Sequence, residues 1–418
     1  MKYDVVTIGA GMSGLIASAK ALSRGKKTLL IAKGQGALPL TSGCIDFWGY
    51  KLDCLDQITV NPFTEIGQLI KQRPEHPYAK VYDILPECVG FLKEILGYSG
   101  YKLVGSLKEN REVLTALGTV RPSSLIPASM AITGRDLIKK VVVVGFKGYG
   151  DFYPRMFLDN LESRIFPRAQ KEIKIIDLGI KSNIKSSFLA SYLSHEEVLA
   201  KIIRECKLAI SGGNIGTRVS PENILFVFPA VLGEQPDNKI WYKLKNELSA
   251  QVIEVPGLPP SIPGQRLENA IMFYLRKMGL EYRRSIEVIG FEAKGDRIIS
   301  LKALDSSFEE HIIEGEQFIL ATGSFWGGGL IFNKKIVKEK IFGLPVFCPP
   351  KLINGTLLNL NGQPFHSAGI EVRKDFRPLS GWRNLYLVGS ILAHTNYIAE
   401  KSGLGLALAT GYKVGSLV

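Results

Sequence analysis

The stretch YDVVTIGAGMSGLIASAKALSRG, residues 3–25, decides the fold. It opens with an apolar run suited to a buried strand, and residues 12–24 then place small and apolar side chains at helical spacing until Gly25. Residues 27–32 form a second apolar run. A strand, a helix and another strand in this order predict a βαβ unit, which implies a parallel sheet with a right-handed crossover.

The turn between the first strand and the helix has the sequence GAGMSG, a G-x-G-x-x-G motif. In such a motif Gly9 permits the tight turn, Gly11 lets a phosphate approach the backbone, and Gly14 lets the helix pack on the strand. Free N–H groups at the helix N-terminus then hold the anion. The residues predicted to bind a nucleotide or flavin phosphate are Gly9, Gly11, Met12, Ser13 and Gly14.

The end of the second strand lacks the acidic residue expected there. In dinucleotide-binding folds a carboxylate about 20 residues after the glycines takes the ribose hydroxyls, but this chain has Ala32 and Lys33. Three alternatives follow: the backbone and Lys33 hold an adenosine, the ligand has no adenosine, as in FMN, or the fold persists without tight cofactor binding. Losing a charge-assisted hydrogen bond costs about 1.5–3 kcal/mol, which weakens an FAD site without abolishing it.

Four later glycine-bearing segments are candidates for contact with the same cofactor. Residues 35–46 form a polar loop that lies along a flavin, or else an ordinary connection. Two apolar strands end in Thr322-Gly323 and Gly389-Ser390. The last helix begins at residues 402–404, and its positive end faces the flavin pyrimidine, or it simply packs closely through small residues. The cofactor-binding residues predicted here are Lys33, Ser42, Gly43, Thr322, Gly323, Gly389, Ser390, Ser402, Gly403 and Leu404.

Three polar residues are candidates for catalysis or anion binding. His366 lies in the loop PFHSAGIEV, while Arg121 and Arg266 stand next to turn signals. No metal site is predicted, because the five cysteines form no C-x-x-C motif. Their odd number and wide spacing indicate a reducing compartment.

The composition predicts a globular α/β protein of two domains, with 418 residues, 46% hydrophobic residues and 43 glycines. A net charge of +13 favours anionic partners, namely a phosphorylated substrate, an anionic membrane face or an acidic subunit; a lysine-rich surface is the plain alternative. The basic residues are scattered, which argues against nucleic acid. We expect no secretory signal and no membrane-spanning helix.

The predicted fold is α/β, with a Rossmann-like flavin-binding domain and a second α/β substrate or cap domain. The first domain combines a parallel sheet with an antiparallel hairpin insertion around residues 294–296. Buried strands are predicted within 139–152 and 219–233, and a helix from the proline-rich turns near 260 to about Met278. The predicted flavin domain covers 1–60, 261–324 and 380–418, and the predicted cap domain covers 61–260 and 325–379.

Along nearly its whole length the chain resembles the B-type subunit of anaerobic glycerol-3-phosphate dehydrogenases. The most particular segments are KGQGALPLTSGCIDF (33–47) and LPPSIPGQRLENAI (258–271). The glycine motif and the segments 139–152, 319–330 and 385–405 agree as well.

The resemblance implies a flavoprotein that oxidises sn-glycerol 3-phosphate to dihydroxyacetone phosphate and passes electrons toward a quinone pool in anaerobic respiration. It implies FMN as the cofactor, with FAD as the alternative, and Gly389-Ser390 departs from the glycine-aspartate pair of many FAD enzymes. The implied partners are a flavoprotein, the A-type subunit, and an iron–sulfur, membrane-associated protein, the C-type subunit. We therefore expect a cytoplasmic protein that reaches the inner face of the membrane through a partner.

Two other functions stay open from the sequence. A succinate/fumarate-type flavoprotein oxidoreductase is suggested by His366 ahead of Gly369-Ile370. A non-catalytic scaffold subunit is the other, in which the partner flavoprotein carries the oxidation.

Overall fold

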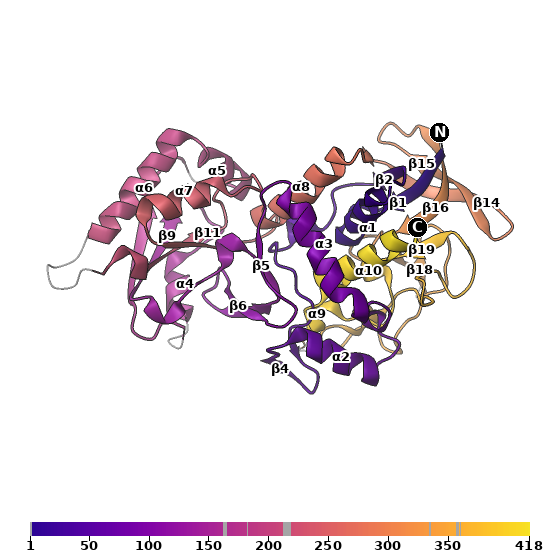
Figure 1. The fold of residues 1–418 in the computed structure, drawn as a ribbon, viewed down its shortest axis with the longest axis horizontal. Helices are drawn as coiled ribbons and strands as arrows, with labels where there is room; N and C mark the ends of the chain where they lie inside the picture. Colours follow the sequence, from indigo (N-terminus) through magenta and orange to yellow (C-terminus); the bar gives the residue numbers. More distant parts are fainter. Residues whose placement is uncertain are drawn as a thin grey trace.

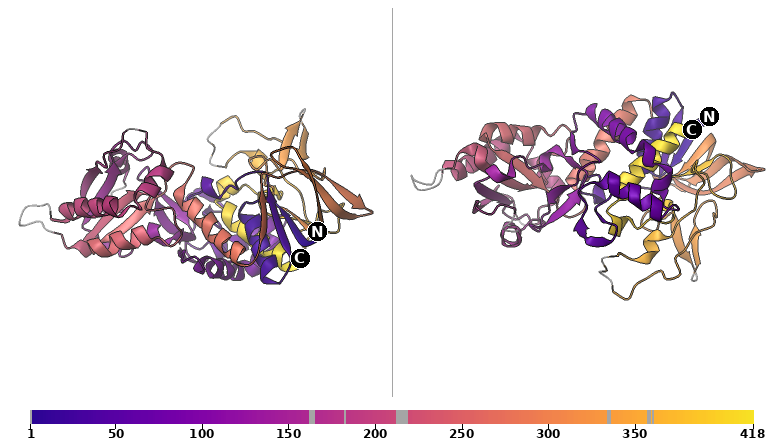
Figure 2. Two further views of the ribbon diagram at one scale, coloured as in Figure 1. Left: turned by 90° about the horizontal axis from the view of Figure 1, so that it is seen from above. Right: turned by 60° about the horizontal axis from the view of Figure 1, so that its bottom comes forward.

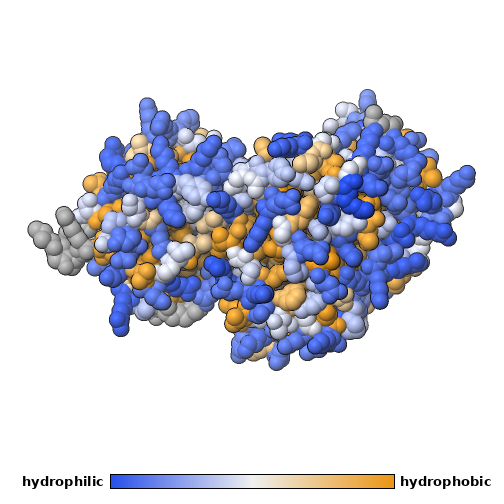
Figure 3. Space-filling model, in the orientation of Figure 1, coloured by the Kyte–Doolittle hydropathy of each residue, from blue (hydrophilic) through white to orange (hydrophobic). Residues whose placement is uncertain are grey.

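The computed structural model describes residues 2–161, 165–181, 183–211, 219–333, 336–356, 359 and 361–418. The chain forms two lobes joined side by side, as Figures 1 and 2 show. One lobe is built on a seven-stranded sheet and carries both termini, and the other is built on a four-stranded sheet. Figure 3 shows hydrophilic residues over much of the drawn face of both lobes.

The larger sheet has the strand order β13-β2-β1-β16-β15-β14, with β19 also paired to β16. Five of its strands run parallel to one another: β13, β2, β1, β16 and β19. The antiparallel insertion is formed by β14, β15 and the first half of β16. This arrangement confirms the predicted parallel sheet with its hairpin. The bounds are β1 (Lys2–Ile8), β2 (Thr28–Ala32), β13 (Glu281–Arg284), β14 (Glu287–Lys294), β15 (Arg297–Leu304), β16 (Glu310–Leu320) and β19 (Leu385–Leu387).

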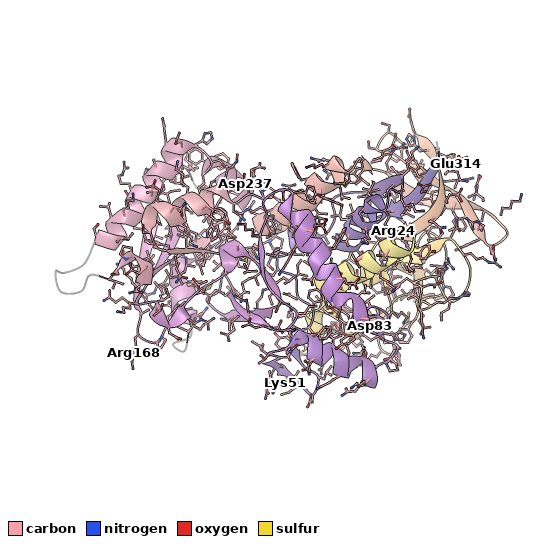
Figure 4. The ribbon with its side chains drawn as sticks, in the orientation of Figure 1. Arg24, Lys51, Asp83, Arg168, Asp237 and Glu314 are labelled. Carbon is pink, nitrogen blue, oxygen red and sulfur yellow. The ribbon has the colours of Figure 1, made fainter. Side chains whose placement is uncertain are left out.

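Helix packing in the larger lobe centres on α1 and the C-terminal helix α10. Small residues let these two helices approach closely: a Cβ added at Gly411 would lie 2.4 Å from the Ser13 carbonyl oxygen. At the far end of α1, Arg24 donates to the carbonyl oxygens of Ser416 and Val418, and Figure 4 labels it there. The helices of this lobe are α1 (Met12–Ser23), α2 (Pro62–Gln72), α3 (Leu85–Gly97), α8 (Ile262–Lys277), α9 (Tyr397–Glu400) and α10 (Gly403–Leu417).

The second lobe confirms the predicted second α/β unit. Its four strands are all parallel in the order β10-β9-β11-β12, and helices alternate with them along the chain. Strand β9 is buried along its whole length, as its run of valines predicts. The elements are β9 (Lys140–Phe146), α4 (Pro154–Asn160), β10 (Gln170–Ile176), α5 (Ser186–Tyr192), α6 (Glu196–Ser211), β11 (Ile224–Pro229), α7 (Lys239–Leu248) and β12 (Gln251–Val255).

Short two-stranded sheets complete the molecule. The pairs β3–β4, β5–β8 and β6–β7 belong to residues 50–127, and β17–β18 follows the larger sheet in the chain. Their bounds are β3 (Tyr50–Lys51), β4 (Cys54–Ile58), β5 (Leu103–Gly105), β6 (Arg111–Leu114), β7 (Val120–Ser123), β8 (Leu125–Pro127), β17 (Leu330–Asn333) and β18 (Ile336–Glu339).

The hydrophobic cores divide the chain differently from the predicted domain boundaries. Buried residues of α2 and α3 and of residues 330–376 share one core with the larger sheet, although the prediction assigned them to the cap. The second core draws on residues 114–262. The difference arises because α3 packs on α8 and α10, contacts that the sequence pattern of 61–135 does not specify. Within the described residues, no helix combines the length and apolarity needed to cross a bilayer.

Candidate functional site

The turn after β1 is shaped by two glycines that admit no side chain. Gly9 has φ +113°, and a Cβ there would lie 2.3 Å from the Ala321 carbonyl oxygen. A Cβ at Gly14 would lie 2.0 Å from the Gly9 carbonyl oxygen. These contacts hold the end of β1, the start of α1 and the end of β16 together, as a tight glycine turn requires.

Gly11 differs from its neighbours because its missing side chain leaves open space. It caps α1 with φ −74° and ψ 175°, and no atom would lie within 4 Å of a Cβ built there. Among the described residues, no side chain caps the helix, and its first turn holds no acidic residue. The first N–H groups of α1 therefore point into open space beside Gly11, where a phosphate can bind. We call this space, bordered by residues 9–14, the flavin cradle. Met12 and Ser13 are buried behind it.

The ends of strands β19 and β16 also lie next to the flavin cradle. A Cβ at Gly389, whose φ is +77°, would lie 2.4 Å from Ser13 Oγ, and one at Gly323 would lie 3.3 Å from Ser390 Oγ. The buried Thr322 Oγ1 has no hydrogen-bond partner within the described part of the chain. An orphaned hydroxyl beside open backbone is what a bound flavin would satisfy. The structure thus brings together three of the glycine junctions that the sequence singled out.

The loop of residues 35–46 lies against the start of α8. A Cβ at Gly36 would lie 2.0 Å from the Ala10 carbonyl oxygen, so the loop passes directly over the first glycine turn. Gly43 has φ +76° and abuts Pro263, while the Ser261 N–H donates to the Pro39 carbonyl at 2.6 Å. The two segments that carry the most particular resemblance, 33–47 and 258–271, therefore contact each other.

At the end of β2, Lys33 is mostly exposed and is already paired. Its Nζ lies 2.9 Å from Glu287 Oε2, and Glu287 also pairs with Lys340. Because β14 begins at Glu287, next to the end of β2, a carboxylate does lie at the edge where the sequence showed none. It comes from a residue far along the chain, which no local pattern reveals.

The start of α10 is fixed by a buried network. Ser402 Oγ donates to Glu400 Oε2 at 2.9 Å, so this hydroxyl is engaged within the protein. Glu400 also contacts His76 Nε2 at 3.4 Å and Arg73 Nη1 at 3.6 Å. Gly403 and Leu404 stay partly exposed, and the Gly405 N–H donates to the Asp46 carbonyl at 3.0 Å. The start of α10 thus packs closely on the end of the loop 35–46, and its role toward the flavin stays a prediction.

His366 is a buried histidine with a free ring nitrogen. It lies in the short 3-10 helix Pro364–Ser367, is 6% exposed, and its Nδ1 has no partner in the described structure. Burial lowers the pKa of His366, so the imidazole is neutral at pH 7. Its ring lies 5.1 Å from that of Tyr397, which hydrogen-bonds Ser324 beside the Thr322-Gly323 junction. A neutral, unpartnered imidazole at this position suits the acceptance of a proton.

Arg121 also lies near the predicted cofactor loop. Its Nη1 donates to Asp46 Oδ2 at 2.8 Å and its Nη2 to Ser42 Oγ at 2.6 Å. Ser123 donates to the other oxygen of Asp46. The structure therefore joins two residues predicted for separate roles, Ser42 and Arg121, in one polar cluster.

Arg266 is almost fully buried and paired within the protein. It is 1% exposed, and its two Nη atoms donate to Glu254 at 2.6 and 2.9 Å, while Nε donates to the Gly233 carbonyl. The side chain runs from α8 into the carboxyl end of the second sheet, where open α/β sheets commonly bind ligands. An anion there would have to displace Glu254, so the geometry favours a structural role that ties the two lobes.

Replacing Arg266 with methionine is expected to lower the free energy of unfolding by about 3 kcal/mol, because Glu254 would stay buried without its partner. Urea unfolding at pH 7 measures this. The matched control is Arg276→Met, an exposed position on the same helix where the change should stay within about 0.5 kcal/mol. Lost activity at unchanged stability would instead support the anion-binding role predicted from sequence.

Sequence reasoning missed four residues of this region. Three of them, Tyr397, Glu400 and Lys401, lie in the segment 385–405, of which only other residues were predicted to bind the cofactor. Glu287 lies on the hairpin strand β14. For Tyr397 to Lys401 the available signal was their position directly before the helix start at 402–404. Glu287 offered no such signal.

Comparisons with known proteins agree with a flavin-binding role for this region. Residues 4–406 match the family model described as "FAD binding domain". The chain is 28% identical to a protein of Vibrio vulnificus (strain CMCP6) named as the B-type subunit of anaerobic glycerol-3-phosphate dehydrogenase, covering 98% of this chain and 94% of that protein. It is 26% identical to the protein of that name from Haemophilus ducreyi, covering 100% and 99%. The family match supports FAD as the cofactor and gives no support to FMN.

Among solved structures, a flavocytochrome c3 fumarate reductase in an open conformation has a TM-score of 0.47 and 9% identity, covering 100% of this chain and 78% of that one. The quinol fumarate reductase of E. coli has a TM-score of 0.42 and 9% identity, covering 100% and 70%.

Proposed function

Since the chain belongs to the FAD-binding-domain family, we propose that it is the flavin-binding subunit of an anaerobic glycerol-3-phosphate dehydrogenase. In this role it oxidises sn-glycerol 3-phosphate to dihydroxyacetone phosphate. The names of its relatives from Vibrio and Haemophilus support the substrate, at 26–28% identity over nearly the whole chain.

The observation that carries the proposal is the neutral, buried His366 with its unpartnered Nδ1 beside the flavin cradle. Oxidation of a secondary alcohol removes a proton from the hydroxyl and a hydride from the carbon. When bound, the flavin supplies the hydride acceptor. His366 Nδ1 takes the hydroxyl proton, and the aromatic neighbours Phe365 and Tyr397 hold the imidazole in place.

The residues proposed to hold the flavin line the cradle. The backbone of Gly9, Gly11, Met12, Ser13 and Gly14 takes the diphosphate, and Thr322 Oγ1 supplies a free hydroxyl. Contacts along the rest of the cofactor come from Ser42, Gly43, Gly323, Gly389, Ser390, Gly403 and Leu404.

We propose FAD rather than FMN. The adenosine half would lie at the end of β2, where Glu287 supplies the carboxylate that Ala32 and Lys33 lack. The ion pairs of Glu287 with Lys33 and Lys340 hold that carboxylate in its charged form, ready to accept ribose hydroxyls. Mass measurement of the cofactor released by heating distinguishes FAD from FMN.

The partners are also part of the proposal. The names of the relatives designate one subunit of an enzyme, which supports assembly with other chains. We propose a second flavoprotein, the A-type subunit, as electron-transfer partner. An iron–sulfur protein, the C-type subunit, is proposed to connect the complex to the inner face of the membrane and its quinones.

The chain loaded with FAD should lose its visible flavin absorption when sn-glycerol 3-phosphate is added without oxygen, and dihydroxyacetone phosphate should form in equal amount. Succinate and fumarate serve as the comparison, since a succinate/fumarate-type enzyme would respond to them instead. If the flavin binds but glycerol 3-phosphate reduces it only after the partner flavoprotein is added, the scaffold function replaces the catalytic one.

A further inference from the structure

Lys401 is a partly buried cation without a partner. It follows α9 with a left-handed backbone, φ +49°, and no ion pair or hydrogen bond engages its ammonium within the described residues. Its stem is packed against residues far away in sequence: a Cβ at Gly49 would lie 2.7 Å from Lys401 Cβ and 3.4 Å from Pro122 Cγ. Gly49 therefore makes room for this lysine, which is held in place although its charge is unpaired.

The described charged side chains that act on Lys401 are one acidic residue, Asp46, and one basic residue, Arg121. Asp46 is its acidic neighbour, but both carboxylate oxygens of Asp46 are already taken, by Arg121 and by Ser123. Burial is the largest influence and lowers the pKa of Lys401; the charge of Asp46 raises this pKa, and the smaller influence of Arg121 lowers it. A buried charge that the protein does not balance is costly, and an external anion would offset that cost.

Lys401 and Tyr397, whose ring packs on the proposed base His366, are carried by one short segment. Tyr397, which packs on His366, begins α9, and Lys401 follows its last residue. Four residues of helix rise about 6 Å, so the backbone of Lys401 lies about that far along the axis from Tyr397, the neighbour of His366. The backbone between them is fixed, because the Gly49 N–H donates to the Glu400 carbonyl at 2.9 Å.

We propose that Lys401, next to Arg121, forms an anion subsite that binds the phosphate group of the substrate and thereby places its secondary hydroxyl at His366. This rests on the proposed function for the identity of the substrate. The binding of a phosphate monoester at Lys401 itself follows from the charge and packing just described. The class of ligand is a small phosphorylated polyol rather than an unphosphorylated one.

Calorimetric titration with inorganic phosphate tests the subsite without turnover. The flavin-loaded chain should bind phosphate, and Lys401→Gln should weaken that binding about 10- to 100-fold, as expected for loss of one charge-assisted hydrogen bond. Lys401→Arg should restore most of it. The matched control is Lys71→Gln on α2, an exposed lysine that likewise has no described partner.

Turnover gives a second, separate measurement. In Lys401→Gln the KM for sn-glycerol 3-phosphate should rise by about the same factor with little change in kcat. Unchanged phosphate binding and KM in Lys401→Gln would overturn the subsite and leave the proposed function standing. Phosphate binding that depends on Lys401, in a chain that does not oxidise glycerol 3-phosphate, would keep the subsite and reject the proposed function.

Discussion

Replacing Gly11 with valine is expected to abolish flavin binding while the chain still folds. Gly11 has an extended backbone that any residue adopts, and a Cβ there would meet no atom of the described residues within 4 Å. The valine side chain would instead fill the space in front of the first N–H groups of α1. Losing two charge-assisted hydrogen bonds to the diphosphate, each about 1.5–3 kcal/mol, should weaken flavin affinity about 1000-fold or more. Quenching of flavin fluorescence on titration measures the affinity.

The control for this change is Gly90→Val on α3, where a Cβ also meets nothing within 4 Å but no cofactor is expected. It should bind flavin as the unaltered chain does, and both variants should keep the circular dichroism of the parent. Gly14→Ala is the informative contrast, because its Cβ would lie 2.0 Å from the Gly9 carbonyl oxygen and the turn itself must distort. If the Gly11→Val chain folds and binds flavin with full affinity, the diphosphate does not bind at the start of α1.

The parts of the fold that sequence predicts well are those whose pattern is local. The glycine turn at residues 9–14, the valine run of β9 and the hairpin at Gly295 each carry their own signal within about ten residues. The helix after the proline-rich turns ends at Lys277, next to the predicted Met278. Residues 61–135 gave no such signal, because α3 owes its place to contacts with the distant helices α8 and α10.

In the candidate site, too, sequence patterns predict local features but not contacts between residues that are far apart in the chain. Glycines mark where a backbone passes a ligand, so the junctions at Gly11, Gly323 and Gly389 were visible in the sequence. Charged partners are not visible, because pairs such as Lys33 with Glu287 form between residues that are far apart in the chain. Arg266 was singled out as an anion binder because nothing local showed that Glu254 would lie against it.

Replacing His366 with glutamine is expected to lower kcat for glycerol 3-phosphate oxidation by about 100- to 10,000-fold, the range for loss of a general base. Glutamine keeps much of the volume against Phe365 and Tyr397, so the flavin should remain bound. The KM should change little, since the phosphate group would still meet Lys401. Stopped-flow reduction of the bound flavin measures the chemical step apart from product release.

The pH dependence gives the sharper test of the same residue. Burial lowers the pKa of His366 below the ordinary histidine value of about 6.5, and only the neutral ring accepts a proton. In the unaltered chain the rate should therefore be constant through neutral pH and fall in acid, at a pH below about 6.5. The His366→Gln chain should lack this step, while His195→Gln, at an exposed position of the second lobe, should keep both the rate and the profile. An unchanged acid limb in His366→Gln would assign the proton transfer to another group, since a residue that only supports the fold has no reason to set that pKa.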